Sequence, residues 1–430
     1  MKSEEHYKNL DGLRGVAALA VVFYHYATTF FPFLIGYSIT TRHSHFDRLF
    51  SNTPFGLPFA GNFAVCIFFV LSGFVLSVGF FKHGRQIATL VSSATRRYFR
   101  LMLPALGAIL LAYVLMRLGL FYNHQAAAIS QTSVTVSQLW HFPAHLTSAL
   151  FQGLYTIWFG NYSNIASYNN VLWTMHYELF GSFLVFMVLA LFGSTKNRWL
   201  FYGILALAFV KSYYLAFIAG VAISDLTYNL PAYKNYLKAW ILWPALAVGI
   251  FLGTWTANIY PHLRTGYTHA WPFFEWIEAQ QFAHIVGAIM LVVVVLNSGA
   301  LTRVLETRAC QWLGKVSFGL YLTHYLVIGT LASYIFTRLY GADGFKAALV
   351  GSIVVTLPLT FVVAHFYTRL VDIPAIALSK RIGNYLLEGN LLSDVRRAVV
   401  GAGNWQPAPH TQARQAGKPV SGPVPQPEVE

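Results

Sequence analysis

Apolar runs of about 20 residues recur along the chain, separated by short polar or basic segments. An α-helix needs about this length to cross the ~30 Å hydrocarbon core of a bilayer, where backbone polar groups must pair within the helix. The pattern therefore predicts an all-α fold, a multi-pass transmembrane helical bundle. About ten spans are expected, at residues 13–35, 57–81, 98–120, 171–193, 199–212, 213–228, 239–257, 281–298, 313–336 and 347–370.

One further apolar stretch, residues 139–160, is interpreted from the distribution of charge. Lys and Arg collect in the cytoplasmic loops of multi-pass proteins. The segment 82–100 is basic and has no acidic residue, whereas residues 121–170 contain no Lys, Arg, Asp or Glu, which is typical of an outer loop. The later basic loops all fall on the cytoplasmic side only if 139–160 does not cross. We therefore expect ten spans, both termini cytoplasmic, and an interfacial or re-entrant segment at 139–160; the alternative is an eleventh span.

The composition excludes an ordinary soluble domain. Hydrophobic residues make up 56% of the 430 residues and charged residues 10%, against about 25% charged residues in soluble domains. Basic loops beside membrane lipid account for the net charge of +14, so no nucleic-acid partner is expected. Cys66 and Cys310 form no CxxC or Cys/His cluster, so no metal site is predicted.

The C-terminal part differs from the rest of the chain. After a transmembrane domain at 1–375, we expect a basic, amphipathic cytoplasmic segment at 376–401. Residues 402–430 are rich in Pro, Gly, Gln and Ser and have no apolar period. Such a composition cannot bury a core, so this part is predicted to be a disordered cytoplasmic tail.

The first span carries an arginine and a histidine, Arg14 and His25, inside the stretch LDGLRGVAALAVVFYHY. Their separation is about three helical turns, so both side chains lie on one face about 16 Å apart. Gly12 and Gly15 would let another backbone or a ligand approach closely. Arg14 alone is also compatible with a snorkelling charge, and His25 with an inter-helix hydrogen bond. Ionisable groups within spans are nevertheless functional candidates by default.

Two more spans carry ionisable residues. Arg97 and Arg100 in ATRRYFRLMLPAL are three residues apart and face one way at the start of the third span. They are either a topology signal or, because guanidinium forks suit phosphate, a phosphate site. Glu178 in NNVLWTMHYELFGSF lies within the fourth span and needs a partner there. We expect Glu178 at the depth of His25, with His25 or His176 as that partner.

A late motif, LGKVSFGLYLTHYLVI, places Ser317, Tyr321 and His324 on one helical stripe. A tyrosine-rich stripe is more often packing than chemistry, so His324 is a secondary candidate. Asp372 closes the last span beside basic residues, which indicates a structural role.

Taken in order, these motifs resemble the acyltransferase-3 family of integral membrane acyltransferases, of the O-acetyltransferase type. The stretch LDGLRGVAALAVVFYHY resembles the family's Arg-x10-His signature. Four further motifs follow in the family's order: FFVLSGFVLS, the Arg-x-x-Arg pair, LWTMHYELF and LGKVSFGLYLTHYLVI. Order and spacing hold from residue 10 to about 374. The chain differs from the family in having Leu179 where a second Glu is common and Asp372 where Glu is common. It has its Pro-rich tail where some relatives carry a soluble esterase-like domain.

The resemblance implies an acyl-CoA donor, by family acetyl-CoA, that enters from the cytoplasm, and no permanently bound cofactor. The acceptor would be a hydroxyl of a carbohydrate or another hydroxylated small molecule near the outer face. His25 would be the general base, oriented or stabilised by Glu178; a covalent acyl-histidine is the alternative. The CoA phosphates would bind Arg14, Arg97 and Arg100. The acceptor would contact Trp173, Tyr321 and His324.

Two other classes of protein fit part of the pattern. A transporter or flippase of an anionic lipid-linked or small-molecule substrate would also have buried arginines, but it predicts broken helices at matching positions in two halves. The sequence shows no such symmetry. A scaffold subunit gives no reason for His25 and Glu178 within spans. We therefore expect a multi-pass enzyme of the cell (inner) membrane.

Overall fold

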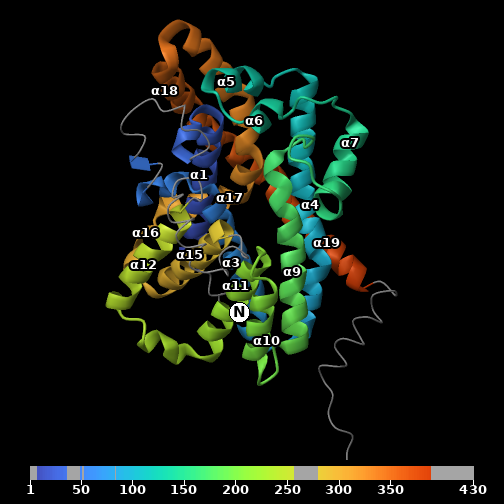
Figure 1. The fold of residues 1–430 in the computed structure, drawn as a ribbon. Helices are drawn as coiled ribbons and strands as arrows, with labels where there is room; N and C mark the ends of the chain where they lie inside the picture. Colours follow the sequence, from blue (N-terminus) through green and yellow to red (C-terminus); the bar gives the residue numbers. More distant parts are fainter. Residues whose placement is uncertain (1–6, 36–48, 51–52, 83, 256–278, 389–430) are drawn as a thin grey trace, which may run out of the picture.

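The computed structural model describes residues 7–35, 49–50, 53–82, 84–255 and 279–388. Within these ranges every regular element is a helix, and no strand occurs. Figure 1 shows long helices packed side by side, several of them running between the top and the bottom of the view. The all-α fold expected from the apolar runs is therefore confirmed.

The main helices overlap the expected spans, except Gly299–Leu305 and Ile373–Glu388, which lie outside them. Their bounds are α1 Lys8–Phe30, α3 Gly61–Lys82, α4 Ile87–Arg117, α9 Trp173–Phe192, α10 Arg198–Ala208, α11 Tyr214–Asn229, α12 Ala239–Thr254, α15 Ala279–Asn297, α16 Gly299–Leu305, α17 Arg308–Val327, α18 Ser333–Tyr367 and α19 Ile373–Glu388. Short 3-10 turns lie at Pro32–Ile35, Pro54–Phe59, Asn170–Leu172 and Pro231–Asn235.

Five helical segments of the described residues are long and apolar enough to cross a membrane: Gly61–Lys82, Ile87–Arg117, Asn170–Phe192, Gln280–Asn297 and Arg308–Leu387. The last of them holds two expected spans, because π-helical turns at Ile328–Ala332 and Thr368–Asp372 join α17, α18 and α19. Gly344, at φ 80°, breaks the helical backbone inside α18. This break lies in the loop that the sequence predicts between spans 313–336 and 347–370.

The segment between α4 and α9 contains only short helices. These are α5 Asn123–Ser130, α6 Val134–Gln138, α7 Leu146–Phe151 and α8 Ile157–Phe159, with a π-helical turn over Gln152–Thr156. The helical run at 146–159 extends about 21 Å, which is short of the ~30 Å hydrocarbon core. It packs along α4, and Figure 1 places α5 and α6 at the same end of the molecule as α18. The stretch expected at 139–160 is thus a short helical segment against the bundle.

Glycines bring α1 and α17 into backbone contact. A Cβ atom on Gly15 would lie 2.5 Å from the amide nitrogen of Gly314, and one on Gly314 would overlap the carbonyl oxygen of Asp11. Small residues commonly permit such close helix contacts in membranes. Further along the same pair of helices, His25 meets His324, so α1 and α17 run parallel. This is the direction that the ten-span arrangement requires of its first and ninth spans.

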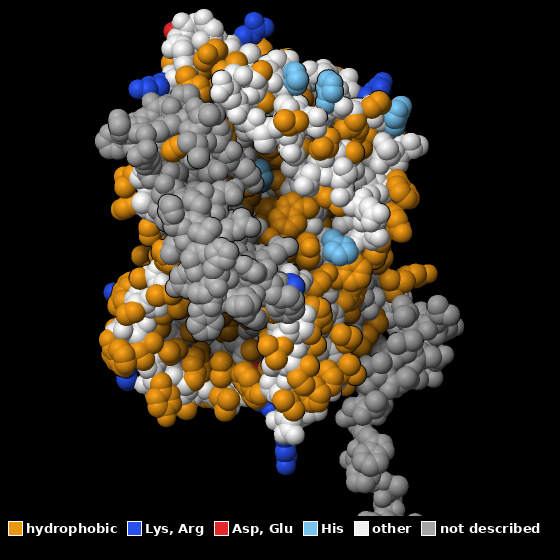
Figure 2. All heavy atoms as spheres, viewed as in Figure 1, with side chains coloured by type: hydrophobic (Ala, Val, Ile, Leu, Met, Phe, Trp, Pro, Cys, Tyr) orange, Lys and Arg blue, Asp and Glu red, His pale blue; other side chains and the backbone are white. Residues whose placement is uncertain are grey.

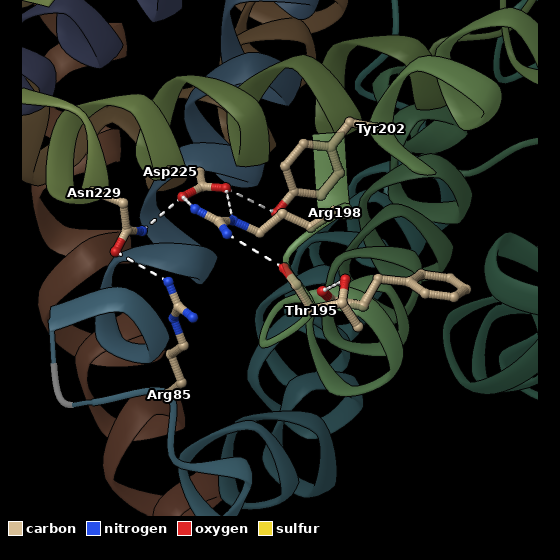
Figure 3. A network of polar contacts seen from close by, with 7 residues as sticks. Arg85, Thr195, Arg198, Tyr202, Asp225 and Asn229 are labelled. Carbon is tan, nitrogen blue, oxygen red and sulfur yellow. Dashed lines mark hydrogen bonds and ion pairs between the residues drawn. The ribbon is translucent and has the colours of Figure 1, made fainter. Parts of the chain in front are cut away.

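A buried ion pair fixes α10 against α11 (Figure 3). Arg198 binds Asp225 through two nitrogen atoms, at 2.5 and 3.1 Å, and Asp225 is fully buried. Tyr202 and Asn229 donate to the same carboxylate, at 3.3 and 2.6 Å. Arg85, in the turn between α3 and α4, donates to Asn229 at 3.2 Å. The network therefore ties this turn to α10 and α11.

Charged side chains are unevenly distributed over the face seen in Figure 2. Lys and Arg lie near its top and over its lower half, and hydrophobic and uncharged side chains fill the band between them. The face is hollowed near its centre, where hydrophobic side chains and a histidine are visible. A band without Lys or Arg is the surface that a bilayer favours, because exposed charge is costly in hydrocarbon.

The predicted domain boundaries fall on a continuous helix or outside the described residues. Helical structure runs from the π-turn at Thr368–Asp372 through α19 without a break near 375. Residues 389–430, which hold half of the expected segment at 376–401 and all of the tail at 402–430, lie outside the described residues.

Replacing Gly15 by alanine tests the contact between α1 and α17. The added methyl group meets the backbone of α17, so we expect Gly15→Ala to destabilise the bundle by about 1–3 kcal/mol. The measurement is thermal unfolding of the detergent-solubilised protein. Gly79→Ala is the matched control, because nothing lies within 4 Å of its Cβ position in α3. Equal unfolding temperatures for the two variants would contradict the contact.

Candidate active site

A cavity of about 460 Å³ lies among α1, α3, α4, α9, α17 and α19. It brings together side chains that are far apart in the sequence. Four cations and three carboxylates line it, so its wall carries one excess positive charge; they are Arg14, Arg97, Arg100, Lys315, Asp11, Glu178 and Asp372. The three arginines expected to act together thus share one cavity.

Arg97 is held by two side chains of α9, one of which is also bound from α3. Its Nη2 donates to Oε1 of Glu178 at 2.5 Å, and its Nε donates to the hydroxyl of Ser182 at 2.7 Å. Ser72 on α3 donates to the same oxygen of Glu178 at 2.6 Å. The two charged side chains are each 15% exposed, so the ion pair is largely desolvated. These bonds use two of the five N–H groups of the guanidinium fork.

Arg100 connects α4 to the π-helical turn between α18 and α19. Its Nη1 donates to Oδ1 of Asp372 at 2.7 Å, and its guanidinium lies over the ring of Phe318, 5.4 Å from the ring centroid. The sequence indicates a structural role for Asp372 at the end of the last span. The structure pairs Asp372 with Arg100 and places it in the lining of the cavity.

Arg14 and Lys315 lie where α1 and α17 touch. Arg14 donates to Asp11 one turn earlier at 3.3 Å, and both side chains are about a third or less exposed. Lys315 is exposed, and it is the one described cation of the cavity wall that has no carboxylate within ion-pair distance. The sequence analysis did not select Lys315. The available signal was its place next to Gly314, where α17 meets α1 most closely.

Tyr321 and Thr174 line the part of the cavity that lies nearest to the histidines. The hydroxyl of Tyr321 donates to the carbonyl oxygen of Val171 at 2.6 Å and lies 2.7 Å from the hydroxyl of Thr174. The ring centroid of Tyr321 is 6.2 Å from that of His324. The cavity therefore approaches the histidines to within one helical turn of α17.

His25 and His324 form a pair across the interface of α1 and α17. Nδ1 of His25 lies 3.0 Å from Nε2 of His324. His25 is half-buried and His324 is fully buried. The ring of Tyr325 covers His25 at a centroid distance of 4.4 Å, and Trp140, from the segment between α4 and α9, packs on Tyr325 at 5.3 Å. The site thus has an apolar aromatic wall on the side of that segment.

Glu178 has different partners from those expected. It binds Arg97 and Ser72, whereas His25 pairs with His324, and Nδ1 of His176 lies 2.7 Å from a backbone carbonyl oxygen. The expectation that His25 or His176 is the partner of Glu178 is therefore wrong.

The start of α9 explains this difference. Asn169 donates to the carbonyl oxygen of Leu322 at 2.8 Å, so the chain already lies beside the C-terminal half of α17 where α9 begins. Glu178 then lies about 7 Å further along α9 from Trp173, at the level of Arg97. The segment 160–172 enters the bundle before α9 starts. Glu178 therefore lies past the level of His25, at the level of Arg97.

Trp173 packs among aromatic side chains away from the charged wall. Its ring centroid lies 5.6 Å from that of Tyr213 and 6.0 Å from that of Tyr177, and Trp173 is not among the residues that line the cavity. Its contact with an acceptor stays a prediction.

The arrangement combines two chemical capacities. Guanidinium forks and an ammonium group on one wall suit a ligand that carries phosphate groups. An imidazole is suited to take a proton from a hydroxyl near neutral pH. Because Tyr321 adjoins both, a ligand anchored on the cations can extend toward His25.

Comparisons with known proteins point to acyl transfer. A family model described as an acyltransferase domain matches residues 7–365. The O-acetyltransferase PaAT-1 of Phomopsis amygdali is 25% identical over 421 residues, covering 86% of this chain and 83% of the relative. Acyltransferase R4 of a Phoma species is 23% identical, and the match covers 70% of this chain and 74% of the relative. Acyltransferase clz18 of Cochliobolus lunatus is 24% identical, and the match covers 69% of this chain and 74% of the relative. No solved structure matches the chain.

The matched family region contains the cavity-lining cations on α1, α4 and α17 and both histidines. It also includes every helix from α1 to nearly the end of α18. The family match therefore covers most of the chain, and this chain belongs to the acyltransferase-3 family.

Proposed function

We propose that the chain is a membrane O-acyltransferase that moves an acyl group, by family acetyl, from acyl-CoA to a hydroxyl. The acceptor is a carbohydrate or another hydroxylated small molecule. The observation that carries the proposal is the cation-lined cavity that extends to Tyr321, next to the pair of His25 and His324. The relatives named as an O-acetyltransferase and as acyltransferases support acyl transfer.

Donor binding is assigned to the charged wall. The phosphate groups of CoA bind Arg14, Arg97, Arg100 and Lys315, which lie on three helices around one cavity. Glu178 and Asp372 hold two of the arginines in place before the donor arrives, which reduces the ordering cost of binding. The apolar lining near Phe68 and Phe69 then accommodates the uncharged pantetheine arm.

Acyl transfer is assigned to His25. It takes the proton of the acceptor hydroxyl as the oxygen attacks the thioester carbonyl, and the proton leaves on the CoA thiol. Glu178 acts in this scheme through Arg97 and donor binding. The donor, which is made in the cytoplasm, enters from the end of the bundle where the arginines lie, and we place the enzyme in the cell (inner) membrane with membrane lipid around it.

Donor binding is tested first, because it needs no knowledge of the acceptor. In a thermal-shift titration, acetyl-CoA at 100 times its Kd should stabilise the detergent-solubilised protein by ~2.7 kcal/mol. Lys315→Gln should raise the Kd by about tenfold, since it removes one charge-assisted contact and breaks no described ion pair. Lys346→Gln, an exposed lysine of α18 outside the cavity, should leave the Kd unchanged.

A truncated donor separates phosphate binding from general effects of the substitution. S-acetylpantetheine lacks the CoA phosphates, so wild type and Lys315→Gln should bind it equally. A tenfold difference that persists with this donor would refute the phosphate contact. If folded wild-type protein shows no shift with acetyl-CoA or with longer acyl-CoAs, the donor assignment fails, and transport of an anionic substrate becomes the better explanation.

The second prediction concerns the base. His25→Ala should reduce acetyl transfer by about 10²- to 10⁴-fold, the usual contribution of a general base, while the Kd for acetyl-CoA stays within about twofold. Transfer is measured with radiolabelled acetyl-CoA, reconstituted protein and a panel of sugars and alcohols. His365→Ala, on α18 beside Trp312, is the control histidine. Full activity of the His25 variant would remove His25 from the reaction.

The third prediction concerns Glu178. Because its carboxylate holds Arg97 and not His25, Glu178→Gln should raise the KM for acyl-CoA several-fold, about as much as one charge-assisted bond contributes, and change kcat much less. Steady-state kinetics with varied donor measure both constants. A large fall in kcat at unchanged KM would instead place Glu178 in the chemical step.

A further inference from the structure

His324 is engaged at both ring nitrogens and has no exposed surface. Its Nδ1 lies 2.8 Å from the carbonyl oxygen of Leu320, its Nε2 lies 3.0 Å from Nδ1 of His25, and its exposed fraction is 0%. A side chain in this state has no free polar atom with which to contact an acceptor molecule. The geometry of His324 therefore indicates that it affects the reaction through its hydrogen bond to His25.

The two carbonyl oxygens determine where the protons lie. A carbonyl oxygen only accepts a hydrogen bond, so Nδ1 of His324 carries the hydrogen that it donates to Leu320. Nδ1 of His25 lies 2.9 Å from the carbonyl oxygen of Val21, so it carries a hydrogen as well. That hydrogen is shared between two acceptors, the oxygen of Val21 and Nε2 of His324. Nε2 of His324 is therefore unprotonated, and its lone pair accepts the hydrogen of His25.

This proton pattern leaves one nitrogen as the base. When Nδ1 of His25 carries the hydrogen, Nε2 of the neutral ring has the lone pair. No described residue donates a hydrogen bond to Nε2 of His25, and His25 keeps partial exposure, unlike His324. The ring therefore presents an unprotonated nitrogen on the side away from His324.

We propose that His324 is a positioning residue that fixes the tautomer of His25 and stabilises the imidazolium formed during transfer. This inference rests on the proposed acyltransferase function. The acceptor hydroxyl gives its proton to Nε2 of His25 while its oxygen forms the new ester bond. The C–S bond of the thioester breaks, and the CoA sulfur takes the proton back from Nε2. Throughout, the lone pair of His324 accepts the hydrogen on Nδ1 of His25, the part that a carboxylate takes in a Ser-His-Asp triad.

Two substitutions of similar volume separate this role from packing. In His324→Gln the side-chain carbonyl oxygen can still accept the hydrogen of His25 Nδ1, whereas His324→Leu cannot. We expect kcat to fall about 100-fold or more in His324→Leu and by less than about tenfold in His324→Gln. The Kd for acetyl-CoA should stay within about twofold of wild type in both variants, since His324 does not line the donor cavity.

The kinetic result has two outcomes that refute the proposal. Equal losses of kcat in the Gln and Leu variants would show that the accepting atom does not matter. A loss that appears in the donor Kd and not in kcat would assign His324 to donor binding.

A spectroscopic measurement keeps the inference testable if a variant fails to fold or if no acceptor is found. Solid-state ¹⁵N spectra of histidine-labelled wild-type protein in lipid report which nitrogen of each ring carries the hydrogen. The signal of His25, identified by its loss in His25→Ala, should show a protonated Nδ1 and an unprotonated Nε2. The opposite tautomer would refute the proposal. If folded wild-type protein binds no acyl-CoA, the proposed function fails, while this readout of the His25 tautomer still tests the part assigned to His324.

Discussion

The backbone contact between α1 and α17 is the constraint on which the rest of the site depends. Gly15 and Gly314 let the two helices touch and run parallel, so residues on both of them fall along one line of contact. Arg14 and Lys315 lie near the start of this line, and the two histidines meet about 16 Å further along α1. A donor anchored by its phosphates at the first point can therefore present its thioester near the second.

Charge balance explains how arginines can lie within such a bundle. Arg97 and Arg100 each have a carboxylate partner, supplied by α9 and by the turn before α19, because an unpaired charge in a desolvated site is strongly destabilising. The same carboxylates orient the guanidinium groups toward a common cavity. The excess charge comes from Lys315, which is exposed and has no carboxylate within ion-pair distance among the described residues. The cavity is thus stable when empty and still attractive to an anion.

Tyr321 separates the charged wall from the histidine pair. Its hydroxyl is fixed at the start of α9, by Thr174 and by Val171 of the preceding 3-10 turn, and its ring adjoins His324. Donor recognition and proton transfer are therefore carried out by different residues, the first by cations on α1, α4 and α17 and the second by the histidines of α1 and α17. This division explains why we expect the substitutions at Lys315 and Glu178 to change donor binding and those at the histidines to change the rate.

The sequence by itself determined the helical class, the positions of most helices and the shared face of Arg14 and His25, because apolar length and the 3.6-residue period act within one helix. The family motifs also selected all three arginines that line the cavity. Only the tertiary structure decided the partners: Arg97 for Glu178, His324 for His25, and a place in the wall for Lys315. A partner across an interface depends on the depth and rotation at which two helices meet. Here the glycine contacts of α1 and the entry of α9 beside Leu322 set that depth, and no periodicity within one helix encodes it.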